Sequence, residues 1–180
     1  MHPDPESQSL LFQIGLLIVL TIINALFSGA EMALVSTSRA RVEQRAAEGD
    51  KKYQQLLGIL KQPSNFLSTI QIGITLINIL SGASLADTLA SKLAPVLGGT
   101  PAAKNLASII ILAILTYVSI VFGELYPKRI AQNLKEKYAL ASVTPLKILG
   151  GIMSPFVWLL ATSTNILSKL TPMTFDDNTE

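Results

Sequence analysis

The chain has 180 residues, of which 49% are hydrophobic and only 14% are charged. Because ordinary soluble domains carry about 25% charged residues, this composition predicts a membrane protein of one domain with three or four spans of about 20 residues. Cysteine is absent, which excludes disulfides and thiolate metal sites, and a net charge of +2 is too small to indicate nucleic acid.

The N-terminal third predicts a tail, a span and a basic loop. Residues 1–9 are polar without Lys or Arg, and residues 10–35 are apolar and long enough to cross a bilayer. Residues 36–62 then carry six of the fourteen basic residues in a sequence that favours helix, so we expect juxtamembrane helices there. The positive-inside rule places this loop in the cytoplasm and the tail outside the cell membrane.

Two further spans are predicted, at residues 66–89 and 106–126, joined by a connector rich in proline and glycine. The third span should end at Pro127, because proline breaks helices, and Lys128 and Arg129 then return the chain to the cytoplasm. The fold class is therefore an all-α membrane protein with three transmembrane helices, a multi-pass arrangement in the bilayer.

Residues 130–170 should form a second set of juxtamembrane helices. The apolar run 148–161 has only 14 residues, so we interpret it as re-entrant or interfacial, with Trp158 as an anchor. Three crossings leave the C-terminus inside. The acidic tail 171–180 stops abruptly, and we expect a truncation point there, after a transmembrane domain spanning 10–170.

The end of the third span carries the sharpest functional signal. A carboxylate within a bilayer costs roughly 2.5–3.5 kcal/mol, so Glu124 is expected to face a cavity or a partner. Pro127 has no N–H for the Gly123 carbonyl four residues back, which leaves that oxygen beside the carboxylate. Hard cations such as Mg²⁺ bind such oxygens, and the stretch therefore predicts a cation site.

Polar residues in the other spans share helix faces. Asn24 and Ser28 are four residues apart, and Asn78 precedes Ser81 and Gly82 by three and four. Packed together, these faces predict a cavity whose oxygens come from Ser28, Asn78, Gly123 and Glu124, with Ser28-Gly29 loosening the first helix. A second group of candidate ligands comprises Asn24, Glu31, Ser81 and Gly82.

Each candidate also has an interpretation that needs no ion. Ser28 and Ser81 fit helix packing, and Asn78 fits an interhelical hydrogen bond. Glu124 is spaced to pair with Lys128 four residues later. Glu31 lies near the end of its span, where an ion pair is as well supported as a ligand role.

Three ordered motifs, NALFSGAEMAL at 24–34, GITLIN at 73–78 and FGELYPK at 122–128, together resemble the transmembrane domain of the CNNM/CorC magnesium transporters, in the bacterial CorC form. The resemblance covers roughly residues 8–170. It implies a homodimer in the bacterial inner membrane that exports Mg²⁺, with sodium entry as a coupled step. It also implies a dehydrated Mg²⁺ site on Ser28, Asn78, the Gly123 carbonyl and Glu124.

In that family, cytoplasmic CBS modules that bind ATP follow the membrane part, and none lies within these 180 residues, so ATP is expected to act only through them. The resulting hypothesis is a magnesium transporter with its site near the membrane midplane. A sodium-driven or proton-driven carrier using Glu124 and a membrane anchoring and dimerisation module remain alternatives. An enzyme is not expected, because no nucleophile and base are paired in the sequence.

Overall fold

The computed structural model describes residues 5–170, with side chains described within 10–81, 86–164 and 166–167. Every element in this part of the chain is helical, and three of the helical segments are long and apolar enough to cross a membrane: Leu10–Ser36, Pro63–Leu93 and Pro101–Thr164. The prediction of an all-α membrane protein is confirmed. The predicted tail at 171–180 lies outside the described residues.

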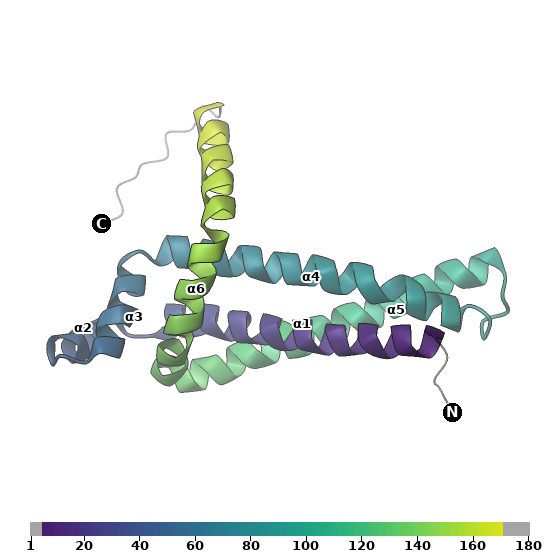
Figure 1. Cartoon of the computed structure of the whole chain (residues 1–180), viewed down its shortest axis with the longest axis horizontal. Coiled ribbons are helices and arrows are strands. Elements are labelled where there is room, and N and C mark those ends of the chain that lie inside the picture. Colours follow the sequence, from purple (N-terminus) through teal and green to yellow (C-terminus); the bar gives the residue numbers. More distant parts are fainter. Residues whose placement is uncertain (1–4, 171–180) are drawn as a thin grey trace.

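Three long helices lie side by side and form the body of the molecule (Figure 1). They are α1 (Pro5–Ser36), α4 (Pro63–Leu93) and α5 (Pro101–Ile120). Proline at the first position of α4 and of α5 fits these helix starts, where its missing N–H removes no helical bond. The first helix begins inside the stretch expected as a tail.

Two short helices, α2 (Arg39–Ala47) and α3 (Lys51–Lys61), sit at one end of the body, which we call the α2–α3 end (Figure 1). The Asp50 carboxylate caps α3 by accepting from the Lys52 N–H at 2.9 Å. These helices occupy the basic loop predicted between the first two spans.

The helix does not break at Pro127, so the expected helix end is wrong, whereas the membrane boundary of the third span stays a prediction. A π-helical turn, η1 (Val121–Leu125), follows α5, and α6 (Tyr126–Leu170) continues directly from it. Within the turn the Tyr126 N–H donates to the carbonyl of Val121, five residues back. The wider turn gives room for the Pro127 ring, which would clash with the carbonyl four residues back in an ordinary α-helix.

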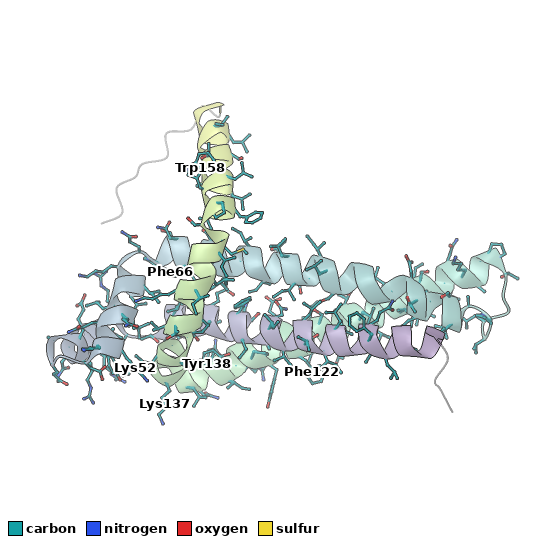
Figure 2. All side chains as sticks on the ribbon, viewed as in Figure 1. Lys52, Phe66, Phe122, Lys137, Tyr138 and Trp158 are labelled. Carbon is teal, nitrogen blue, oxygen red and sulfur yellow. The ribbon has the colours of Figure 1, made fainter. Side chains whose placement is uncertain are left out.

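Helix α6 kinks at Lys135, where φ is 14° and ψ is −90°. Beyond the kink it runs crosswise to the long helices and extends past α4 (Figure 1). The run 148–161 lies in this crosswise part, and Trp158 is 68% exposed there (Figure 2). Whether the segment lies at the membrane interface stays a prediction.

The main core lies toward the α2–α3 end, where α1, α2, α3, α4 and α6 meet. Its buried side chains are mainly small or aliphatic, and they include Leu34, Val42, Leu56, Ile59, Ile70, Val143 and Leu146. Large apolar side chains elsewhere on the long helices face outward, as expected for surfaces in contact with lipid. The core thus anchors α6 against the ends of α1 and α4.

A polar contact adds to this anchor. The Tyr53 hydroxyl of α3 donates to the Glu136 carboxylate of α6, which also pairs with Arg41 at 3.6 Å. The hydrogen bond to Glu136, followed by burial, raises the pKa of Tyr53 above its ordinary value. The neutral phenol is therefore the form that ties α3 to α6.

Gly29 has a packing role instead of the loosening that we expected. Helix α1 runs unbroken through Ser28 and Gly29, and that expectation is wrong. A Cβ at Gly29 would lie too close to the Tyr138 ring, whose hydroxyl donates to the Leu26 carbonyl at 3.3 Å (Figure 2). The missing side chain lets α6 pack directly on α1.

Replacing Gly29 by alanine should therefore destabilise the domain by about 1–3 kcal/mol, the usual range for overpacking. The measurement is thermal unfolding of the purified domain in detergent. Gly15→Ala is the matched control, because nothing lies within 4 Å of a Cβ there. When Tyr138→Ala is already present, Gly29→Ala should cost much less, and an unchanged cost would contradict the packing argument.

Candidate cation site

Two asparagines join α1 to α4 in the middle of the body. The Asn24 Nδ2 donates to the Asn78 Oδ1 at 3.2 Å, and the Ser119 hydroxyl of α5 lies 3.5 Å from the same oxygen. Asn24 is 1% exposed. An amide pair in such a setting holds two helices together and keeps oxygen atoms at the depth of the spans.

The π-turn packs against this pair through Gly123. A Cβ on Gly123 would lie 2.9 Å from the Asn24 Nδ2, so a side chain there would force η1 and α1 apart. Gly123 is buried, whereas its neighbour Phe122 is 56% exposed on the outer side of the bundle (Figure 2). Three elements therefore meet around Asn24, whose amide lies against the backbone of the π-turn and bonds Asn78 of α4.

Buried oxygens near this point have no hydrogen-bond partner among the described residues. They are the Asn24 Oδ1 and the Ser28 Oγ, and Ser28 is fully buried one helical turn after Asn24. An unsatisfied buried oxygen costs about 1–3 kcal/mol, so such atoms call for an explanation. Two of them on one face of α1 are suited to accept a donor or to ligate a cation.

Both carboxylates of this region meet one ammonium group. Lys128 Nζ lies 3.1 Å from the Glu31 Oε2 and 2.9 Å from the Glu124 Oε1, and all three side chains are between 23% and 36% exposed. The sequence left open an ion pair or a ligand role for Glu31 and for Glu124. In the structure both carboxylates form an ion pair with Lys128. Partial exposure screens these pairs, so their strength is modest.

A cavity of about 210 Å³ opens on the other side of Asn78, away from Lys128. It lies among α1, α4 and α5, and its polar lining comes from Asn78, Ser81, Thr116 and Ser119. The apolar remainder is Leu17, Leu112, Leu115 and Ile120. Polar groups thus continue from the asparagine pair toward the end of the body opposite α2 and α3.

Some of the predicted site residues are in contact with one another, and others have side chains that pair elsewhere. Asn24 contacts both Asn78 and Gly123, and Ser28 shares a helix face with Asn24. Glu124 adjoins Gly123 but its carboxylate pairs with Lys128. Of the second group, Ser81 lines the cavity and Glu31 joins the ion pair, while for Gly82 only its place in α4 is described. Their role as Mg²⁺ ligands stays a prediction.

Sequence reasoning missed Ser119 and Thr116 as part of this polar path. A signal was available, because Ser119 precedes Gly123 by four residues and Thr116 precedes Ser119 by three, which places all three on one helix face. The link from Glu31 to Lys128 had no such signal, since it joins two helices that are distant in sequence.

The described residues contain no group of three or more His, Cys, Asp or Glu side chains that could hold a metal ion. A cation site here must therefore combine one or two carboxylates with neutral oxygens. That donor set suits hard cations and does not suit zinc or copper, which favour nitrogen and sulfur.

Three apolar helices around a buried polar cluster define a multi-pass helical membrane domain. Residues 15–180 match the family model described as the cyclin M transmembrane N-terminal domain, and the chain belongs to this CNNM family.

Curated relatives come from several bacteria. The chain is 38% identical over 168 residues to the UPF0053 protein sll0260 of Synechocystis, which covers 91% of this chain and 38% of the relative. It is 33% identical to the UPF0053 inner membrane protein YfjD of Escherichia coli, covering 82% of this chain and 32% of the relative. A Polyamine export protein of Haemophilus influenzae is 28% identical, with coverages of 86% and 36%. The chain thus spans less than two fifths of the length of these relatives.

A double-mutant cycle on Asn24→Ala and Asn78→Ala tests the amide pair. Hydrogen bonds between membrane helices couple by about 0.6 kcal/mol on average and at most about 1.7 kcal/mol, and we expect a coupling in this range. Unfolding of the purified domain in detergent supplies the free energies. Strictly additive losses would show that the two amides contribute independently.

Proposed function

We propose that this chain is the membrane domain of a magnesium transporter, with Mg²⁺ as the transported substrate. The observation that carries the proposal is the pair of buried, unpartnered oxygens on Asn24 and Ser28, next to a π-turn whose residue Gly123 lies against Asn24. A domain that only anchors or dimerises gains nothing from unsatisfied oxygens, whereas a transporter needs them for its cargo.

The donor set fits a hard divalent cation. Mg²⁺ prefers about six oxygen ligands in an octahedron. The proposed site would draw on five: the side-chain oxygens of Asn24, Ser28 and Asn78, the Gly123 carbonyl and, once it leaves Lys128, the Glu124 carboxylate. The sixth is water or the Glu31 carboxylate. Asn78 Oδ1 already accepts from Asn24 and approaches Ser119, so an arriving ion must displace the weaker of these contacts.

The direction and setting of transport follow the family. We propose export from the cytoplasm, coupled to sodium entry, by a homodimer in the bacterial inner membrane; the name of the Escherichia coli relative supports the membrane. The cavity on one side of Asn78 and the Lys128 ion pair on the other form the two approaches to the site. Alternating access then requires that only one approach is open at a time.

Calorimetry with Mg²⁺ on the purified domain tests the proposal. Glu124→Gln removes the charged ligand, and because a hydrogen bond or ion contact to a charged group contributes about 1.5–3 kcal/mol, affinity should fall by about 10-fold to 150-fold. Asn78→Ala should also weaken binding. Glu43→Gln is the control, since Glu43 is an exposed carboxylate of α2. Unaltered Mg²⁺ binding by Glu124→Gln would rule out the site as proposed.

A polyamine is the second candidate substrate, favoured by two observations. One relative is named a Polyamine export protein, and here Glu31 and Glu124 together hold a primary ammonium, which is the group at the ends of a polyamine.

Competition separates the two substrates. If Mg²⁺ is the cargo, putrescine at equal concentration should leave Mg²⁺ calorimetry unchanged and should not accumulate in liposomes that contain the domain. Saturable putrescine binding that is lost in Glu124→Gln, together with no Mg²⁺ binding, would instead assign the polyamine.

The remaining alternatives predict different ion responses. A carrier driven by sodium or protons would show thermal stability that responds to sodium or pH and ignores Mg²⁺. An anchoring and dimerisation module would show no ion response at all, and no flux in liposomes. Thermal unfolding measured over a range of Na⁺ and Mg²⁺ concentrations and of pH therefore distinguishes the magnesium transporter, the carrier and the anchoring module with one preparation.

A further inference from the structure

We propose that Lys128 is a tethered cation that occupies the carboxylate pair and must be displaced by the transported ion, an inference that rests on the proposed cation transport. The ammonium bridges Glu31 of α1 and Glu124 of η1, at 3.1 and 2.9 Å. These elements are separate in sequence, and the lysine belongs to a third, α6. Lys128 therefore stands where an external cation would have to reach Glu124.

Charge counting supports displacement over joint occupancy. Two carboxylates and one ammonium sum to −1. A divalent cation added beside Lys128 would bring the group to +1 and would place two cations next to each other, where they repel. If the divalent cation replaces the ammonium, the two carboxylates are neutralised and the group sums to zero. Departure of the lysine is thus the favourable route for binding.

The need to displace Lys128 also sets how strongly an incoming cation must bind the two carboxylates. Because the lysine is tethered, its effective concentration at the carboxylates is high, in the millimolar range or above for a short flexible link. A monovalent cation that replaces it exchanges one unit charge for another and gains no Coulomb energy. A divalent cation doubles the attraction to each carboxylate. Lys128 lowers the affinity for every displacing cation by the same factor, so a divalent cation, which is attracted more strongly to the carboxylates, still binds at concentrations where a monovalent cation no longer does.

The Lys128 ammonium can leave the two carboxylates without a movement of the backbone. Lysine carries its charge on a flexible four-carbon stem, and Lys128 is 23% exposed, so its ammonium can turn toward water while the stem stays packed. The Glu31 Oε2 that it contacts is buried, whereas the Glu124 side chain is 36% exposed. Exchange of one cation for another can therefore begin at Glu124, without a rearrangement of the helices.

Lys128→Met tests the proposal, with thermal unfolding as a readout that does not require transport. Methylammonium chloride is the probe, because it restores the missing ammonium, and tetramethylammonium chloride at equal ionic strength is its control without N–H donors. We expect a saturable rise of about a few degrees with methylammonium in the variant and none in the wild type. Lys137→Met is the matched control, since Lys137 points away from the bundle (Figure 2).

Calorimetry supplies the second arm. Without its internal competitor, Lys128→Met should bind Mg²⁺ about tenfold more tightly than the wild type, and because the same competitor is removed, its affinity for Na⁺ should rise by the same factor. Weaker Mg²⁺ binding together with no methylammonium response would overturn the proposal and show that Lys128 only positions Glu124. If the Met variant does not fold, Lys128→Gln is measured in its place. Absence of Mg²⁺ binding by the wild type would overturn the proposed function, while the methylammonium arm still decides the role of Lys128.

Discussion

The close contact between Gly123 and Asn24 is the constraint on which the middle of the molecule depends. It requires a residue without a side chain in the π-turn, and it requires an amide on α1 that can face both the turn and Asn78. Because Asn24 uses its Nδ2 for Asn78, its own oxygen is left over inside the bundle. Close packing and a free oxygen are therefore two results of one arrangement.

Electrostatics divides the polar path into two unlike parts. Toward the α2–α3 end the charges compensate one another in the Glu31, Lys128 and Glu124 group, whereas on the other side of Asn78 only hydroxyl and amide groups form the polar lining of the cavity. A cation passing between them would leave a charged environment for a neutral one. The cost of that step falls as more oxygens surround the ion, so under the proposed transport function the ion would rest at the cluster of Asn24 and Ser28.

The sequence predicted the helical class and the polar faces well, because apolar length and three-to-four spacing reflect local geometry. Asn24 and Asn78 were found this way and Gly123 from its place four residues before Pro127, and Asn24 does contact both Asn78 and Gly123. The π-turn was not predicted, since Pro127 indicates a break and only tertiary packing of η1 on α1 decides that the helix continues. The contact between Glu31 and Lys128 was not predicted for a similar reason. It depends on how the start of α6 packs on α1, which no local sequence pattern encodes.

The π-turn also sets the rotational register of everything after it. One residue corresponds to about 100° around a helix. A chain with an ordinary α-turn at 121–125 would present a different face of α6 to the rest of the molecule, and Tyr138, which sits against Gly29, and Glu136, which receives Tyr53, would both turn away from their partners. Shortening this turn by one residue would thus disrupt contacts about three turns downstream, because the turn sets the rotational position of the α6 residues that follow it.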